Sequence, residues 1–212
     1  SAALLVIGTV LTAVNEWNNP GTLGPMSVWD KINNAWFASA LARTTGFNAL
    51  DYSQFHSETL LGTDLLMFIG GGSAGTSGGI RIATFAVLIY ILIAEIRGDS
   101  RVNAGNRRLG VSVQRTAVAL TTLSAIWVAI MVAILQAITD FSTDQIFFEV
   151  LSAFATCGLS TGITPLLPAP AKILLMVMMF TGRIGLVLVA TSLAKRAHPM
   201  TYKLPKERPL IG

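Results

Sequence analysis

Long apolar runs separated by short polar segments predict that this chain is built from membrane helices. Residues 116–138 are 23 consecutive positions without a charge, enough to cross a bilayer once at about 1.5 Å per residue. Residues 173–194 form a second run of this kind, with one charge, Arg183, near its middle. The opening run, residues 1–14, is shorter than a crossing requires, so we expect the chain to begin within a helix.

The apolar run from Thr59 to Ala94 is too long for one crossing and contains an interruption. As a single helix its 36 residues would extend about 54 Å, whereas the hydrocarbon core is about 30 Å thick. Six of the ten residues 70–79 are glycine, and each costs about 1 kcal/mol in a helix relative to alanine. Non-helical backbone is tolerated in a bilayer only inside protein or against water, so we predict an intramembrane loop that lines an aqueous path. The alternative is a glycine-packed interface between helices.

Two shorter segments, residues 33–53 and 142–165, have a common plan. Each has a helical stretch too short to span, then a Thr-x-Gly and polar turn residues, which is typical of a re-entrant segment. Ser142 or Thr143 is the expected N-cap of the second one. A shift of 112 positions aligns the two halves without a gap at five identical residues: Thr44 with Thr156, Gly46 with Gly158, Met67 with Met179, Phe68 with Phe180, and Gly70 with Gly182. We therefore predict an internal repeat of helix, re-entrant helix, extended turn and helix.

Composition supports a membrane protein and excludes several other classes. Hydrophobic residues make up 52% of the chain and charged residues only 12%, about half the usual share in soluble domains. Ten of the fifteen Lys and Arg residues lie in two blocks, 97–115 and 195–208, which the positive-inside rule places in the cytoplasm. The single cysteine, Cys157, excludes an intrachain disulfide framework. No catalytic motif is present, which argues against an enzyme, and the basic blocks indicate topology rather than nucleic-acid binding.

The chemistry of the Thr-x-Gly turns suggests cation binding. Extended backbone can present carbonyl oxygens that replace the hydration shell of an ion, and glycine permits backbone geometry denied to other residues. Asn48 also tolerates a left-handed φ. The alternative is a pair of ordinary loop glycines. The two candidate filter stretches are Thr44, Thr45, Gly46, Phe47 and Asn48, and Thr156, Cys157, Gly158, Leu159 and Ser160.

Three motifs together resemble the Trk/Ktr/HKT superfamily of potassium transporters, and above all its KtrB-type, TrkH-like membrane subunit. They are ARTTGFNALDYS (42–53), FIGGGSAGTSGGIR (68–81) and MFTGRIGLVLVA (179–190), and the final residues KLPKERPLIG (203–212) also resemble a KtrB tail. The resemblance implies an all-α polytopic membrane protein in which four pore-loop repeats surround one pore. This chain is similar to the third and fourth repeats, half of a pseudo-fourfold, potassium-channel-like pore.

The resemblance also assigns roles to residues. It implies that K⁺ binds to the backbone carbonyls of Thr45, Gly46, Cys157 and Gly158. Asn48 and Ser160 stand where a tetrameric channel filter has its last glycine, so weaker selectivity for K⁺ over Na⁺ is expected. The implied gate below the filter comprises Gly70, Gly71, Gly72, Ser73, Ala74, Gly75, Thr76, Ser77, Gly78 and Gly79, together with Arg183.

Several charged residues have two interpretations each. Arg183 either donates to the glycine-rich loop and repels cations, or is tied to helix-end carbonyls or a carboxylate. Asp64 either faces the pore or pairs with another helix. Asp51 and Glu58 either concentrate cations at the outer mouth or are solvated, and Glu149 and Lys172 are left as local partners or solvated groups.

The expected organisation is a third-type repeat (1–98, with loop 70–79), a basic cytoplasmic linker (99–115), a fourth-type repeat (116–196) and a cytoplasmic tail (197–212). The resemblance implies potassium uptake across the bacterial plasma membrane. It also implies a homodimer among membrane lipids, cytoplasmic nucleotide-binding regulatory subunits of the KtrA/TrkA kind, no cofactor besides transported K⁺, and Na⁺ coupling as an open option. Alternating access with a midplane site between the repeats is the competing mechanism, and a non-conducting scaffold is a third.

Overall fold

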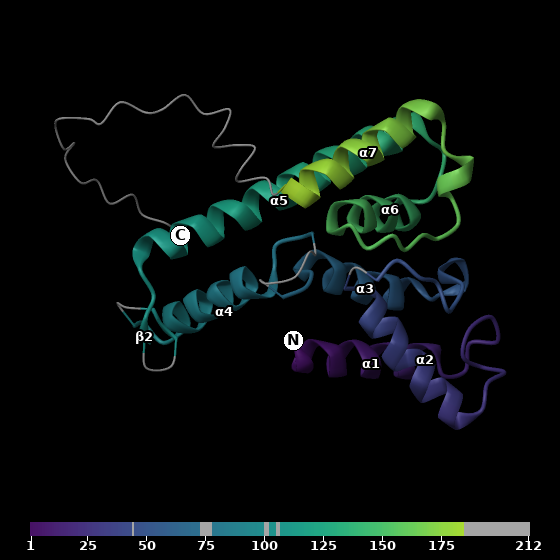
Figure 1. Ribbon diagram of the computed structural model, residues 1–212, viewed down its shortest axis with the longest axis horizontal. Coiled ribbons are helices and arrows are strands. Elements are labelled where there is room, and N and C mark those ends of the chain that lie inside the picture. The colour runs from purple at the N-terminus through teal and green to yellow at the C-terminus, as the bar shows by residue number, and fades with distance from the viewer. Residues whose placement is uncertain (44, 73–77, 100–101, 105–106, 185–212) are drawn as a thin grey trace.

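The computed structural model describes residues 1–43, 45–72, 78–99, 102–104 and 107–184, and these residues form a helical protein (Figure 1). Several predicted features therefore lie outside the described residues. They are Thr44, residues 73–77 of the glycine-rich loop, residues 185–194 of the second apolar run, and the tail at 197–212. The elements are α1 (Ala2–Glu16), α2 (Val28–Leu41), η1 (Tyr52–Gln54), α3 (Ser57–Ile69), α4 (Ile82–Ile96), β1 (Asn103–Ala104), β2 (Arg107–Arg108), α5 (Val111–Ile138), α6 (Thr143–Ala155), η2 (Thr164–Leu166) and α7 (Ala169–Ile184).

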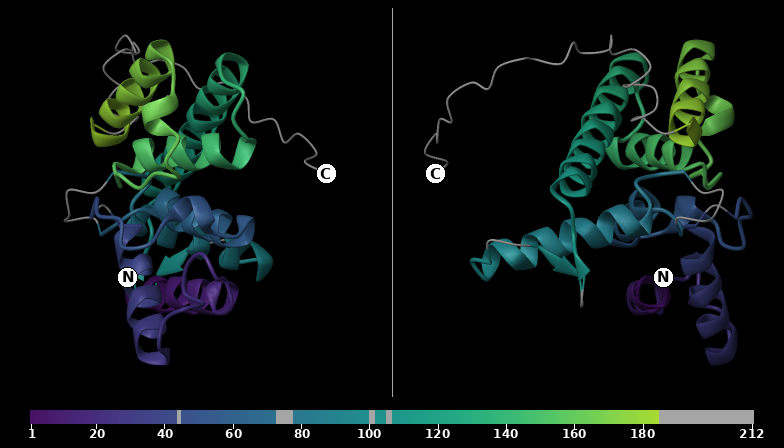
Figure 2. Two further views of the ribbon diagram at one scale, coloured as in Figure 1. Left: turned by 90° about the vertical axis from the view of Figure 1, so that its right-hand side faces the viewer. Right: turned by 60° about the vertical axis from the view of Figure 1, so that its left-hand side comes forward.

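Figure 1 shows two groups of helices, with α1, α2 and α3 below and α5, α6 and α7 above. In both views of Figure 2, α6 lies between the α5–α7 pair and the lower group. The two groups share one buried core, in which the rings of Tyr52 and Phe148 lie 5.5 Å apart between centroids. The all-helical fold expected from the sequence is confirmed, with one antiparallel pair of two-residue strands, β1 and β2, as the exception among the described residues.

The short helices begin at polar N-caps. The hydroxyl of Ser142 accepts a hydrogen bond from the backbone N–H of Gln145, which confirms Ser142 as the N-cap of α6. Ser27 caps α2 in the same way, so this helix begins at Val28 rather than within the segment that starts at residue 33. The helix therefore includes Lys31, which is buried and whose Nζ donates to the Trp17 carbonyl at 2.7 Å.

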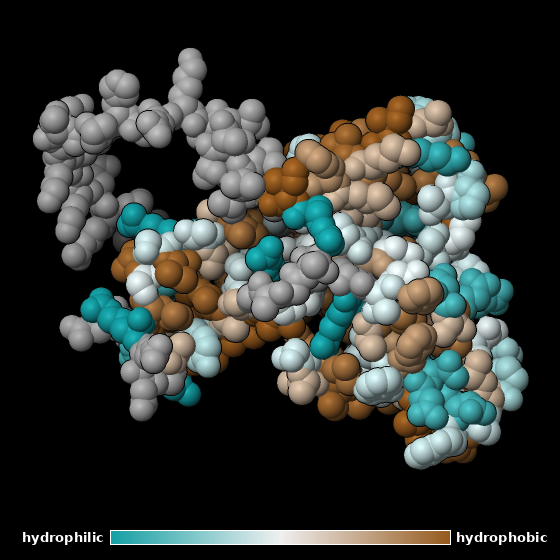
Figure 3. Space-filling model, viewed as in Figure 1, coloured by the Kyte–Doolittle hydropathy of each residue, from teal (hydrophilic) through white to brown (hydrophobic). Residues whose placement is uncertain are grey.

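One helix among the described residues is long and apolar enough to cross a membrane, namely α5. It contains the predicted run 116–138 but starts earlier, at Val111, so Arg115 lies within its first turns. Helices α1 and α4 are also apolar but shorter. Apolar side chains dominate the surface along α7 (Figure 3), where Ile173, Met176 and Phe180 are about two-thirds exposed.

The interruption predicted within the run 59–94 is present, because α3 ends at Ile69 and α4 begins at Ile82. Gly70 ends α3 with a φ of 71°. The two ends of the intervening loop are held together by backbone hydrogen bonds: the N–H of Ile80 donates to the Phe68 carbonyl at 3.2 Å, and that of Ile82 to Gly71 at 3.1 Å. The chain thus leaves and re-enters helical structure at nearly the same point.

The internal repeat appears in the positions of the elements. The shift of 112 residues carries η1, beginning at Tyr52, onto η2, beginning at Thr164, and carries the start of α3 at Ser57 onto the start of α7 at Ala169. It also pairs Gly46 with Gly158, whose φ angles are 76° and 80°. The same local backbone geometry therefore occurs twice in register.

Candidate functional site

The two candidate filter glycines meet each other in the folded chain. A Cβ added to Gly158 would lie 3.3 Å from the Cα of Gly46, and one added to Gly46 would lie 3.6 Å from the carbonyl oxygen of Cys157. Both glycines are exposed and both have a positive φ, which L side chains rarely adopt. Two turns from opposite halves of the sequence thus place bare backbone against bare backbone.

Side chains fix the position of both turns. The buried thiol of Cys157 donates to the carbonyl of Ala42, at the end of α2, with a sulfur–oxygen distance of 3.2 Å. The Thr45 hydroxyl donates to the Ala40 carbonyl at 3.3 Å. Cys157 is thus a packed residue that ties the second turn to the first repeat, rather than a reactive thiol.

Each turn directly follows the C-terminus of a short helix. Helix α2 ends at Leu41 and α6 at Ala155, only a few residues before Gly46 and Gly158. The C-terminal end of a helix carries roughly half a negative charge, which favours a nearby cation. Two such ends at one place create an electrostatic setting suited to a positive ion. No group of three His, Cys, Asp or Glu side chains that could hold a metal is found in the described parts of the chain.

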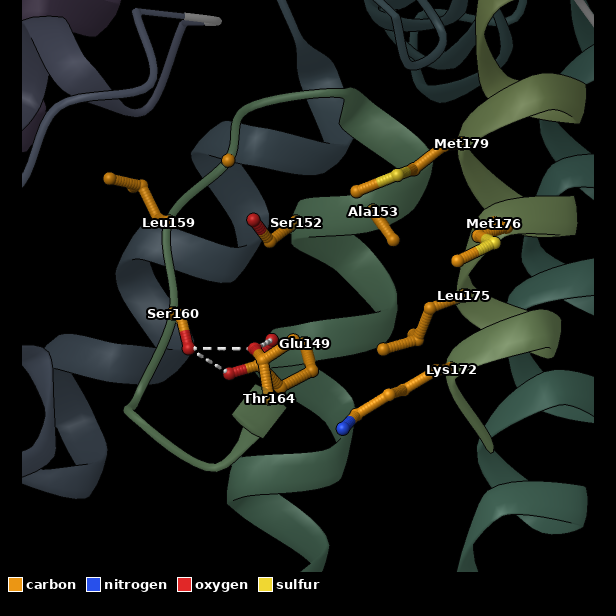
Figure 4. Close-up of a pocket in the computed structure, with 11 residues that line it drawn as sticks. Glu149, Ser152, Ala153, Leu159, Ser160, Thr164, Lys172, Leu175, Met176 and Met179 are labelled. Atoms are coloured by element: carbon orange, nitrogen blue, oxygen red, sulfur yellow. Dashed lines mark hydrogen bonds between the residues drawn. The ribbon is translucent and has the colours of Figure 1, made fainter. Parts of the chain in front are cut away.

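The buried side chain of Glu149, on α6, supports the backbone that follows Gly158 (Figure 4). Its Oε1 accepts hydrogen bonds from the Ser160 hydroxyl at 2.6 Å and from the Thr161 N–H at 3.0 Å and hydroxyl at 3.4 Å. Its Oε2 accepts from the Thr164 hydroxyl at 2.8 Å. Glu149 is therefore a local partner, one of the two interpretations offered by the sequence, and it is the residue whose importance sequence reasoning missed. The cluster of Ser and Thr at 160–164 was the available signal.

A cavity of about 340 Å³ opens beside this turn, between α6, residues 158–164 and α7 (Figure 4). Its lining includes Gly158, Ser160, Glu149 and Lys172. The Lys172 ammonium donates to the Pro165 carbonyl at 2.9 Å, so it too has a local partner.

The end of the glycine-rich loop at Gly78 lies directly against the second turn. The N–H of Gly78 donates to the Thr156 hydroxyl oxygen at 3.3 Å, and a Cβ on Gly78 would be 2.8 Å from the Ala155 carbonyl oxygen. Gly182, on the neighbouring helix α7, has no room for a side chain, because the carbonyl of Phe154 on α6 occupies the place where its Cβ would be. Arg183 follows Gly182 at the end of the described part of α7, with an exposed side chain.

The remaining candidates occupy varied positions. Phe47 is 70% exposed, Asn48 is also exposed, and Leu159 is buried in the core. The left-handed backbone considered for Asn48 does not occur there. Thr156 adopts it instead, with a φ of 54°, because it ends α6. Gly71 is buried and Gly72 exposed, and Gly79 has a φ of 80°.

The acidic residues outside the turns separate into distinct environments. Asp51 is exposed after the first turn, and hydrogen bonds from the hydroxyl and backbone N–H of Ser53 hold its pKa below the usual value. A negative charge therefore persists at this edge of the molecule. Glu58 is exposed in the first turn of α3. Asp64 is buried and faces neither turn but a cavity between α3, α5 and α6.

Residues 2–201 match the family model of TrkH, described as a cation transport protein, and the chain belongs to this family of membrane transport proteins. The matching family is one of cation transport proteins and not of enzymes. Its helical fold is that of the crystal structure of the potassium transporter TrkH from Vibrio parahaemolyticus, with a TM-score of 0.73 and 17% identity over 91% of this chain and 43% of that one.

Curated relatives include Ktr system potassium uptake protein B of Vibrio alginolyticus, 37% identical over 99% of this chain and 46% of that protein. The protein of the same name from Bacillus subtilis is 37% identical over 91% and 43% of the two chains. The potassium/sodium uptake protein NtpJ of Enterococcus hirae is 35% identical over 100% and 48%. The chain therefore spans less than half the length of these relatives.

Proposed function

We propose that this chain forms half of a potassium-uptake pore, in which K⁺ passes along the adjoining turns at Gly46 and Gly158. The observation that carries the proposal is the contact between these two glycines, which the sequence places 112 positions apart and which share a positive φ. Backbone carbonyls of Thr45, Gly46, Cys157 and Gly158 replace the hydration shell of the ion. The C-terminal ends of α2 and α6 stabilise its charge.

Selectivity in this proposal depends on how firmly the carbonyls are held. Glu149 fixes the second turn through four hydrogen bonds, and the Cys157 thiol fixes it to α2. Ser160 takes the position of a channel filter's last glycine and is held by Glu149 at 2.6 Å. Because Asn48 and Ser160 replace the last glycine of a channel filter, the proposed preference for K⁺ over Na⁺ is moderate despite these bonds. Na⁺ coupling is an extension that the name of the NtpJ relative supports.

The glycine-rich loop 70–79 acts in this proposal as a gate on the cytoplasmic side of the filter. Support comes from its described end, where Gly78 bonds Thr156 and packs on the Ala155 carbonyl. Glycine at this position allows a close approach that any Cβ would prevent. Arg183, one residue after the tightly packed Gly182, adds a positive barrier to cations when the loop is closed.

The proposed setting is the bacterial plasma membrane, with the full-length protein as a homodimer. Nucleotide-binding regulatory subunits of the KtrA/TrkA kind would bind on the cytoplasmic side. Exposed Arg97, directly after α4, and exposed Arg108, in β2, provide a basic surface for such a partner, with anionic lipid headgroups as the competing ligand.

Complementation of a bacterium that lacks its own potassium uptake systems tests the proposal. The full-length protein, which contains this chain, is expected to restore growth at submillimolar K⁺ and to take up ⁸⁶Rb⁺. Expression of the full-length protein without its residues equivalent to 42–53 serves as the non-conducting control. Membrane-inserted full-length protein that gives no growth and no rubidium uptake, with or without a co-expressed regulatory subunit, would refute potassium uptake.

A further inference from the structure

A second cavity, of about 500 Å³, lies between α3, α5 and α6 and contains one acidic side chain. Asp64 is 2% exposed, and its Oδ1 is buried without a hydrogen-bond partner among the described residues. The other lining residues are Leu, Phe, Val and Ala, including Leu61, Leu65 and Phe147. Burial of a polar atom without a hydrogen-bond partner lowers the stability of the fold by on the order of 1–3 kcal/mol. A ligand that donates a hydrogen bond to Asp64 would remove this cost.

Apolar side chains are exposed beside this cavity, and neither glycine turn contributes to its lining. Leu61 and Leu65, one helical turn apart on α3, lie at its edge and are 52% and 66% exposed. On the facing helix α5, Ile126 and Ile130 are 52% and 44% exposed. A ligand that reaches Asp64 past these side chains therefore needs an apolar body.

The lining determines the chemistry of the ligand. A bare metal ion needs several oxygen ligands, and the cavity offers only those of Asp64. An organic ammonium needs one counter-charge, and its apolar body would bury against leucine and phenylalanine. The rings of Phe68 and Phe147 add a favourable cation–π environment.

We propose that the α3–α5–α6 cavity is a binding site for an amphiphilic amine, whose ammonium group pairs with Asp64 and whose apolar body fills the cavity. The position equivalent to Asp64 in the other repeat carries no acidic residue. Shifting by the same 112 positions places Met176 where Asp64 stands, and Met176 lies on the exposed face of α7. The proposal depends on membrane location alone and is independent of potassium conduction.

Ligand binding to the full-length protein in phosphatidylcholine nanodiscs tests the site, with empty nanodiscs subtracted. The probes are tritiated 1-adamantylamine and its uncharged isostere 1-adamantanol. We expect saturable binding of the amine, and a loss of about tenfold or more in Asp64→Asn, because a charge-assisted hydrogen bond contributes about 1.5–3 kcal/mol. Binding of the alcohol is expected to change by less than about twofold, since it needs no counter-charge.

Two further variants keep the result decisive. Ala129→Trp fills the cavity with an indole and is expected to abolish binding of both probes, whereas Met176→Leu, at the repeat-equivalent position, leaves amine binding unchanged. Size-exclusion profiles confirm that each variant is folded. Equal affinity for amine and alcohol, an unchanged affinity in Asp64→Asn, or no saturable amine binding in the wild type would each overturn the proposal.

Discussion

Gly158→Ala is expected to reduce potassium uptake by at least about tenfold in the full-length protein. Its φ of 80° costs an L residue roughly 1–2 kcal/mol, and the new Cβ would lie 3.3 Å from the Gly46 Cα in the opposite turn. Both effects displace the carbonyls that we propose to coordinate the ion. Initial rates of ⁸⁶Rb⁺ uptake, normalised to the amount of protein in the membrane, provide the measurement.

Gly162→Ala separates backbone strain from damage to the filter. Gly162 has a φ of 88°, so the substitution introduces a similar strain four residues further along the same segment. A Cβ there has nothing within 4 Å. We therefore expect Gly162→Ala to retain most of the uptake. An equal loss in the two variants would mean that strain alone explains the effect, and would contradict the role given to Gly158.

Glu149→Gln is expected to lower the preference for K⁺ over Na⁺ by about fivefold while the protein still inserts and conducts. The amide keeps only one acceptor oxygen for the donors of Ser160, Thr161 and Thr164, and hydrogen bonds to a charged acceptor are worth about 1.5–3 kcal/mol each. Loss of these bonds loosens the second turn, which admits the smaller ion. Competition of Na⁺ against ⁸⁶Rb⁺ uptake measures the change.

Glu16→Gln is the matched control, because the chain contains a second buried glutamate with the same kind of network. Glu16, at the end of α1, accepts hydrogen bonds from the Thr59 hydroxyl at 2.6 Å, the His56 N–H at 3.0 Å, the Thr22 hydroxyl at 2.8 Å and the Asn19 amide at 2.6 Å. None of these donors belongs to the two glycine turns. Glu16→Gln should lower thermal stability without changing ion preference, and a similar loss of preference in both variants would rule against a positioning role for Glu149.

The sequence was sufficient to predict features that depend on local pattern. An uncharged run of 23 residues indicated α5, and the glycines at 70–79 indicated the interruption between α3 and α4. Five identical residues indicated the repeat, and at Gly46 and Gly158 a shared positive φ accounts for glycine in both halves. The meeting of Gly46 and Gly158 followed only from the resemblance, since no local pattern fixes the distance between segments 112 positions apart.

Features that depend on tertiary contacts were not predictable. Lys31 is buried within α2 because its ammonium reaches the Trp17 carbonyl, a contact that no periodicity reveals. Glu149 could have been a solvated residue until the fold placed four donors around it. Asp64 could have faced the pore, and its position in the cavity between α3, α5 and α6 depends on how α3 is rotated against the other two helices. Asp64 and Glu149 are acidic residues beside apolar ones, and the sequence alone does not show which way such a side chain points.

Anomalous diffraction from crystals of the full-length protein soaked in Tl⁺, a mimic of K⁺, tests the central claim most directly. The account predicts thallium density along the adjoining turns at Gly46 and Gly158, in contact with main-chain oxygens and in line with the C-terminal ends of α2 and α6. Density that is absent there and present elsewhere along the pore would show that these carbonyls do not hold the transported ion.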